Sequence, residues 1–281
     1  MTTAPEGLLA RALTSASGRR GAVLLALIVA AALVLPPFLP NPLAQPDLIR
    51  QANLPPGVGH PFGTDQLSRD VLARVVVGAR VSLSIAALSV ALSISLGATV
   101  GLVAGYLGGL VEALLMRLVD GALAIPRLFV LLLALAVWER VPAYALVLMI
   151  GTTGWFGTSR LVRGEVVRLR ELAFVRSAEA LGAGRWRVIF RHLLPNVSGP
   201  LLVAASLGVG EVILLEAGLS FLGLGIQPPT PSWGGMILDA KGVLVTAPWS
   251  SIFPGLAIVL TVIAVNLIGD ALRGAAAAEI A

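Results

Sequence analysis

Long apolar runs separated by shorter polar stretches follow one another along almost the whole chain. Most runs approach the ~20 residues that a helix needs to cross a bilayer. They do not alternate apolar and polar residues as half-buried strands do. We therefore predict an all-α, polytopic membrane protein. Six transmembrane helices are expected, at about residues 22–39, 82–106, 113–137, 142–157, 198–222 and 251–268.

The polar stretches divide the chain into segments. We expect an N-terminal segment over 1–20, a first span within 21–40, an outer loop with an amphipathic helix over 41–81, a core of five spans over 82–272, and a tail over 273–281. Asp65 is the expected N-cap of the amphipathic helix, which has Val71 and Val75 on one face and Arg69 and Arg74 on the other. This helix is predicted to lie on the membrane surface. A brief polar turn at Glu139–Arg140 separates the third and fourth spans.

A secretory signal peptide has the same outline as the first forty residues. We expect an uncleaved span instead, because the apolar run has about the length that a bilayer requires. In addition, no small-x-small cleavage site follows Pro36-Pro37, where the run ends.

The most polar internal stretch runs from Arg160 to Asn196 and is rich in arginine. Apolar residues at helical spacing predict a short helix over 171–181, which Gly182 ends by taking the left-handed conformation. A second helix is expected to follow and to stop at Pro195-Asn196. Its apolar side is marked by Trp186, Ile189, Phe190 and Leu193. From the residues alone, this pair of helices either meets anionic lipid headgroups or docks onto another protein.

The same stretch resembles the EAA loop of the membrane subunits of bacterial ATP-binding-cassette importers. That pattern is Glu-Ala-Ala, three residues, Gly, and a Leu-Pro about a dozen residues on. Here Arg176-Ser177-Ala178 occupies the position of Glu-Ala-Ala, and Arg176 and Ser177 depart from that pattern. The resemblance implies a cytoplasmic coupling helix that fits a groove in an ATPase subunit. The residues expected to carry this coupling are Arg176, Ser177, Ala178, Glu179, Ala180, Leu181, Gly182, Ala183, Leu194 and Pro195.

Residues 60–83 and 216–236 are similar to segments of the C-type permease subunits of dipeptide, oligopeptide and nickel importers. The resemblance implies the type I importer permease fold, in which one chain forms half of a translocation pathway. It also implies a second homologous permease subunit, separate ATPase subunits that bind ATP with Mg²⁺, and an extracytoplasmic solute-binding protein. Peptides are the expected solute, and nickel or another small solute is the alternative.

Composition excludes several other classes. Hydrophobic residues make up 57% of the chain and charged residues 12%. This composition excludes a water-soluble domain that folds around a single hydrophobic core. No basic stripe alternates with exposed aromatics, so we expect no nucleic-acid partner. With no cysteine and two histidines in separate polar segments, we expect no metal site. No Gly-x-x-x-x-Gly-Lys-Ser/Thr motif occurs, so the chain is expected to bind no cofactor itself and to have no catalytic residues.

Small and charged residues inside the spans mark two kinds of position. Gly97, Gly101 and Gly105 form a strip on which another helix can pack closely. A charged residue within a span costs about 2.5–3.5 kcal/mol on insertion scales, so Arg127, Glu211 and Glu216 are expected to line the pathway or to pair with neighbouring helices.

Two further features of the spans bear on function. Glu211 and Glu216 lie about 140° apart around a helix, which argues against a paired-carboxylate catalytic site. In the third span, Arg117 and Asp120 are expected to pair with each other. An ion-coupled secondary transporter built on Arg127 and the two glutamates is the alternative from another class. It would require two similar halves with interrupted helices, which the sequence does not display.

Charge predicts the orientation. The proposed inner segments contain 13 Lys and Arg residues and the proposed outer segments 6. We therefore expect the chain to lie in the inner membrane of the cell with both termini in the cytoplasm. The outer loop after residue 222 is rich in proline, and Trp233 and Trp249 are expected at the bilayer interface.

Overall fold

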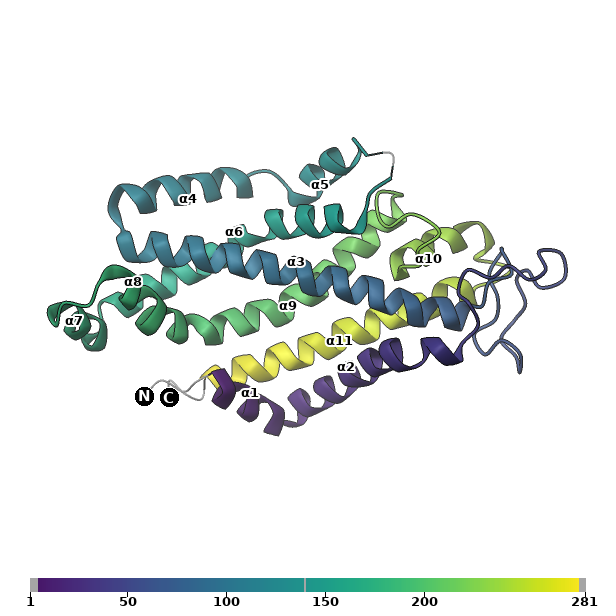
Figure 1. Cartoon of the computed structure of the whole chain (residues 1–281), viewed down its shortest axis with the longest axis horizontal. Coiled ribbons are helices and arrows are strands. Elements are labelled where there is room, and N and C mark those ends of the chain that lie inside the picture. The colour runs from purple at the N-terminus through teal and green to yellow at the C-terminus, as the bar shows by residue number, and fades with distance from the viewer. Residues whose placement is uncertain (1–4, 139, 278–281) are drawn as a thin grey trace.

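The computed structural model describes residues 5–138 and 140–277, and it contains no strand within these ranges. Its long helices lie side by side, with α7 and α8 at one end and the loop before α3, together with α10, at the other (Figure 1). The all-α prediction is therefore confirmed. Glu139 and the outermost residues of both terminal segments lie outside the described ranges. The helices are α1 (Pro5–Thr14), α2 (Ala16–Val34), α3 (Val71–Leu107), α4 (Gly109–Leu123), α5 (Arg127–Leu135), α6 (Ala143–Arg170), α7 (Ala173–Ala180), α8 (Arg185–Val188), α9 (Leu194–Phe221), α10 (Trp233–Ala240) and α11 (Trp249–Ala277), with single short turns at Pro36–Phe38, Ile189–Leu193 and Lys241–Val243.

Within the described residues, four helices are long and apolar enough to cross a membrane. They are α2, α3, the continuous helix from Arg185 to Phe221, and α11, with α4 and α5 together forming a fifth if they are one bent span. α6 has 28 residues, but glycine, threonine and arginine residues interrupt its apolar run. The count of six spans therefore stays a prediction.

From Pro5 onward the N-terminal segment forms α1 and the start of α2, where only a short polar stretch was predicted. Ser15 separates α1 from α2, and its Oγ accepts a hydrogen bond from the backbone N–H of Gly18 at 3.0 Å. Capping by a serine side chain starts α2 at Ala16 and thus six residues before the predicted run. α2 packs along α11: a Cβ on Gly21 would lie 2.6 Å from the carbonyl oxygen of Ala264.

The predicted amphipathic surface helix is wrong as a separate element. α3 runs without a break from Val71 to Leu107, and its cap is Asp70, whose carboxylate accepts from the N–H of Ala73 at 2.8 Å. Nothing between the predicted helix and the predicted span breaks a helix, so the two merge. Arg80 donates to the carbonyl oxygens of Ala32 (2.5 Å) and Leu33 (2.9 Å) at the end of α2.

The third predicted span, at about residues 113–137, is bent into two helices. α4 and α5 meet at an angle of 76° around Pro126, which has no N–H to donate and disfavours a helical conformation for the residue before it. The expected pair of Arg117 with Asp120 is also wrong. Asp120 instead forms an ion pair with Arg160 of α6.

The expected stop at Pro195-Asn196 is likewise wrong. α8 continues through a π-helical turn at Ile189–Leu193 into α9, and Pro195 lies in the first turn of α9. The wider π turn accommodates a residue that cannot donate the regular helical hydrogen bond. Ser198, the first residue of the predicted fifth span, lies within α9, and its Oγ donates to the carbonyl oxygen of Pro195 at 2.7 Å.

The glycine strip of α3 faces α6. A Cβ on Gly97 would lie 2.6 Å from the Cβ of Thr158, and one on Gly101 would lie 2.6 Å from the carbonyl oxygen of Ser159. A Cβ on Gly105 would lie 2.8 Å from that of Val166. The two backbones therefore approach to a distance that no side chain permits at these positions, and close packing is what holds helices together in lipid.

Replacing Gly101 by leucine is expected to lower the free energy of unfolding by about 1–3 kcal/mol or more, because α6 must move away to admit the side chain. Thermal unfolding of the detergent-solubilised protein measures this change. Gly164→Leu on α6 is the matched control, since a Cβ there meets nothing within 4 Å. Equal melting temperatures for the two variants would contradict the packing described above.

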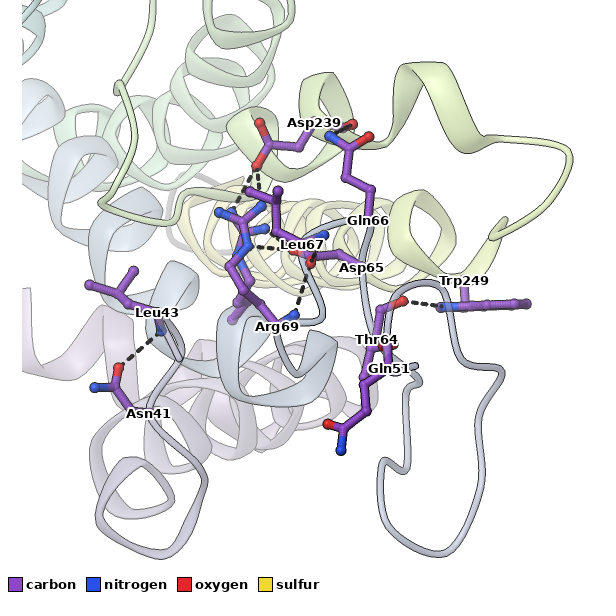
Figure 2. Close-up of polar contacts among 11 residues, drawn as sticks. Asn41, Leu43, Gln51, Thr64, Asp65, Gln66, Leu67, Arg69, Asp239 and Trp249 are labelled. Atoms are coloured by element: carbon purple, nitrogen blue, oxygen red, sulfur yellow. Dashed lines mark hydrogen bonds and ion pairs between the residues drawn. The ribbon is translucent and has the colours of Figure 1, made fainter. Parts of the chain in front are cut away.

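At the opposite end from α7, a buried ion network joins the loop before α3 to α10 (Figure 2). Asp65 accepts from Arg69 Nε at 2.7 Å and forms an ion pair with Arg74. Asp239 of α10 accepts from Arg69 Nη2 at 3.1 Å and from Arg74 Nη2 at 2.9 Å. The two arginines, predicted to face water on a surface helix, are each about 5% exposed or less.

The position expected for Trp233 at the bilayer interface is wrong as well. Its side chain is 1% exposed, and its Nε1 donates to the carbonyl oxygen of Val75 at 3.0 Å. α10 brings it into the core, because Gly234 lets that helix pack closely on α9: a Cβ on Gly234 would lie 2.6 Å from the Cα of Ala217. Trp249 is partly buried, and its Nε1 donates to the carbonyl oxygen of Thr64 at 2.9 Å.

Candidate functional site

The candidate coupling element consists of α7, α8, the turn between them and the π-helical turn at Ile189–Leu193, and it projects from one end of the helices (Figure 1). α7 ends at Ala180, and the turn that closes it contains Gly182, whose φ of +83° lies in the left-handed region. Gly182 N donates to Glu179 O at 2.9 Å, and Ala183 N donates to Ala178 O at 3.0 Å. This pair of bonds is the Schellman arrangement, and it sets the direction in which the chain leaves α7.

The inner side of the element is packed onto the spans. Val175 of α7 and Val188 of α8 are fully buried. They belong to one hydrophobic cluster with Leu102 of α3 and with Val166 and Leu169 of α6. Because interiors are close-packed, a force on the element is transmitted to these helices.

Polar contacts add to this packing. Tyr106, near the end of α3, donates its hydroxyl hydrogen to Glu179 Oε1 at 2.7 Å. Arg170 Nη1, at the end of α6, donates to the carbonyl oxygen of Gly105 at 3.0 Å. The first bond joins α7 to α3, and the second joins the end of α6 to α3. The coupling element, α3 and α6 are therefore linked to one another at this end of the molecule.

Arg176 stands where the related pattern has glutamate, and its guanidinium forms an ion pair with Glu171 in the turn before α7. The hydrogen bond that Arg176 donates to Glu171 is the main reason why the pKa of the Glu171 carboxyl is below its ordinary value, and the positive charge of Arg176 is the second. Arg170 lies 3.5 Å from the other oxygen of the same carboxylate. The unusual residue therefore has a local acidic partner.

The outer side of the element carries exposed apolar groups. We call Leu181, Trp186 and Phe190 the coupling patch. Their exposed fractions are 89%, 65% and 60%. The rings of Trp186 and Phe190 stack with their centroids 6.0 Å apart. Exposed, stacked aromatic side chains such as these two are typical of a surface that binds a partner.

The structure divides the apolar stripe that was predicted for the second helix. Ile189 and Leu193 are buried, whereas Trp186 and Phe190 remain exposed. An apolar stripe predicts which face of a helix is hydrophobic, but not how much of that face its neighbours cover. The two aromatic residues were thus recognised as apolar and missed as a candidate docking surface.

The predicted coupling residues occupy α7, its C-terminal turn and the start of α9. Arg176, Ser177, Glu179 and Ala180 are exposed. Leu194 is half-buried against the hydrophobic cluster, and Pro195 is exposed. The structure therefore presents the α7 residues outward, while Leu194 helps to attach the element to the spans.

The charged residues inside the spans lie in two different environments. Arg127 Nη1 donates to Glu211 Oε1 at 2.8 Å, so α5 is joined to α9. Glu216 is 1% exposed. It accepts from Ser220 Oγ at 2.7 Å and from Ser82 Oγ at 3.2 Å. Glu216 thus has buried hydroxyl partners, whereas the side chain of Glu211 is 68% exposed.

Comparison with known proteins identifies relatives over most of the chain. A family model described as "Binding-protein-dependent transport system inner membrane component" matches residues 97–280. A protein of Brucella suis biovar 1 (strain 1330) that is named as a peptide permease is 42% identical over 258 residues, covering 91% of this chain and 84% of the relative. The dipeptide transport system permease protein DppC of Alkalihalophilus pseudofirmus is 38% identical over 221 residues, or 78% and 72% of the two chains. The oligopeptide transport system permease protein OppC of Bacillus subtilis is 35% identical over 255 residues, or 91% and 83%.

Proposed function

The chain belongs to the family of binding-protein-dependent transport system inner membrane components, and from this membership we propose that it forms half of a translocation pathway for peptides, driven by a separate ATPase. The names of the relatives support peptides as the solute, since they are peptide, dipeptide and oligopeptide permeases. A second, homologous permease subunit forms the other half of the pathway. Nickel or another small solute is the competing cargo.

The coupling patch is the structural observation that carries the ATPase part of this proposal. It lies on an element whose opposite side is packed against α3 and α6. Burying the three exposed side chains in a groove of a partner would recover about 25 cal/mol for each Å² of apolar surface. The partner is an ATPase that binds ATP with Mg²⁺, and closure of its subunits moves the coupling element and tilts the spans.

The remaining partners follow from the two ends of the molecule. α1 and the end of α11 lie at the same end as α7 and α8 (Figure 1). The proposed cytoplasmic position of the coupling element therefore places both termini in the cytoplasm. The loop before α3 and α10 then lie outside, where a solute-binding protein delivers the peptide.

Replacing Gly182 by valine is expected to reduce recovery of the ATPase roughly 5- to 30-fold in a pull-down with the purified transporter. The reason is that a β-branched residue at φ +83° costs about 1–2 kcal/mol, and a helix that relieves this strain leaves its docking position. ATP-driven uptake of a peptide into vesicles should fall in parallel.

The matched control is Gly184→Val. Gly184 also has open space around it, but its φ is −65°, which any residue can adopt. This variant should retain both the ATPase and uptake. If Gly182→Val bound the ATPase and transported peptide as the wild type does, the coupling assignment would be overturned.

A further inference from the structure

Glu211 presents its carboxylate on a surface that lipid cannot cover. It lies ten residues before Phe221, roughly 15 Å along the axis from the end of α9, within one of the candidate spans. Its side chain is nevertheless 68% exposed. A carboxylate at such a depth faces water or protein rather than hydrocarbon.

Arg127 holds this carboxylate in a defined position. Its Nε donates to Thr153 Oγ1 at 3.2 Å, its Nη2 to the carbonyl oxygen of Ile150 at 2.7 Å, and its Nη1 to Glu211 Oε1 at 2.8 Å. Gly154 makes room for the guanidinium, because a Cβ there would lie 2.9 Å from Nη2. All three nitrogens of Arg127 are therefore engaged.

The second oxygen of the carboxylate is available. No hydrogen bond joins Glu211 Oε2 to any residue within the described ranges 5–138 and 140–277. An ionised carboxylate has about four acceptor positions, and Arg127 Nη1 fills one of them. Each nitrogen of Arg127 already donates one hydrogen bond, whereas this carboxylate oxygen accepts none within the described residues, so the unmet capacity of Glu211 is for a donor such as a cationic group.

A hollow opens beside the pair. It has a volume of about 260 Å³ and lies between α3, α5, α6 and α9. Pockets that enclose a drug-sized ligand measure about 300–1,000 Å³, so this hollow suits one end of a peptide better than a whole one. Apart from the charged pair and larger apolar side chains, its lining is made of small residues: Ser93, Gly154, Gly157, Thr158, Ala204 and Gly208.

We propose that Glu211 Oε2 binds the α-ammonium group of the transported peptide as it passes, with Arg127 as the positioning residue. This inference rests on the proposed function. An α-amino group has an ordinary pKa of about 7.7–8.0 and is largely charged at neutral pH, with three hydrogens to donate. The positive charge of Arg127 weakens the attraction, so the peptide is held only transiently, as passage through a pathway requires.

The test uses a cysteine as a probe of the hollow, because the chain contains none of its own. Ser93→Cys places a thiol in the lining and leaves Glu211 intact. The full transporter, with cysteine-free partner subunits, is reconstituted in vesicles and treated with a water-soluble thiol reagent. Val259→Cys, at a 51% exposed position of α11, is the control for a span surface away from the hollow.

We expect Ser93→Cys to react at least about tenfold faster than Val259→Cys, and alanyl-alanine to slow its reaction about tenfold. N-acetyl-alanyl-alanine, which lacks the charged amino group, should leave the rate unchanged. Adding Glu211→Gln should remove the protection by alanyl-alanine, and adding Glu211→Asp should preserve it.

Several outcomes would overturn this inference. They are a Ser93→Cys thiol that does not react, equal protection by both peptides, or protection that persists in Glu211→Gln. The first of these would mean that the hollow is closed to water in the assembled transporter, so that a peptide cannot enter it. ATP-driven uptake of alanyl-alanine by the same wild-type vesicles distinguishes a failure of this inference from a failure of the proposed peptide transport. Uptake without protection overturns this inference alone, whereas absence of uptake overturns the proposed peptide transport and this inference together.

Discussion

Replacing Asp65 by asparagine is expected to destabilise the protein by about 3–5 kcal/mol, the cost of removing one partner from a buried ion pair. An asparagine oxygen can still accept from the backbone N–H groups of Leu67 and Arg69, which Asp65 Oδ1 now binds at 2.8 and 3.0 Å. The charge, however, is lost. Arg69 and Arg74 would then share Asp239 as their one remaining carboxylate in the network. Thermal unfolding in detergent and the yield of intact transporter measure the effect.

Asp47→Asn is the matched control for this variant. Asp47 lies in the same loop and accepts from the backbone N–H groups of Ile49 and Arg50, both at 3.0 Å, but it belongs to no ion pair in the described structure. It should melt at the wild-type temperature.

A double variant tests the charge balance itself. Asp65→Asn combined with Arg74→Met leaves one arginine facing one acid, so it should be more stable than Asp65→Asn alone. Equal melting temperatures for Asp65→Asn and Asp47→Asn would show that the network contributes little to stability.

Replacing Trp186 by alanine is expected to weaken binding of the ATPase by about 2–4 kcal/mol, or roughly 30- to 1,000-fold, if the tryptophan is the anchor of the coupling patch. Its side chain is large, 65% exposed and stacked on Phe190. Its removal from the free permease uncovers no buried contact of the core, so stability should change little. The affinity for the purified ATPase and the rate of ATP-driven peptide uptake measure the effect.

The competing interpretation of this element is that its arginines bind anionic lipid headgroups. Arg187→Glu, one position along α8, is the matched variant for that case. If the element docks onto the ATPase, Trp186→Ala should impair uptake in neutral and anionic vesicles alike. Wild-type ATPase affinity in Trp186→Ala, together with uptake that depends on anionic lipid and is lost in Arg187→Glu, would support the lipid interpretation instead.

Part of the candidate site could be predicted because its signals are local. Gly182 follows an amphipathic stretch and is followed by Gly184, and this pattern indicates the end of α7 before any tertiary contact is known. The exposure of Trp186 and Phe190 has no such signal. It depends on α3 and α6 covering Ile189 and Leu193 but not the two aromatic side chains.

Helix boundaries also depend partly on local sequence signals and partly on tertiary packing. The predicted end at Pro195 rested on a rule that holds for a regular α-helix, whereas a π-helical turn lets the chain continue through this residue. The bend at Pro126 follows the same rule and was missed, because the apolar run continues on both sides of it. A proline marks a position of weakness, and the packing around it decides whether the helix bends or continues.

The sequence by itself determined the class of the protein: an all-α, multi-pass membrane chain of a known permease family. Hydrophobicity, turn residues and family motifs are properties of neighbouring residues, so they can be recognised without coordinates. Only the tertiary structure decided where the charged residues go. Arg69 and Asp239 are 170 residues apart, and Arg127 and Glu211 are 84 residues apart, yet each pair forms an ion pair. A charge is placed by whichever partner the fold brings near it, and that partner is not encoded in the local pattern.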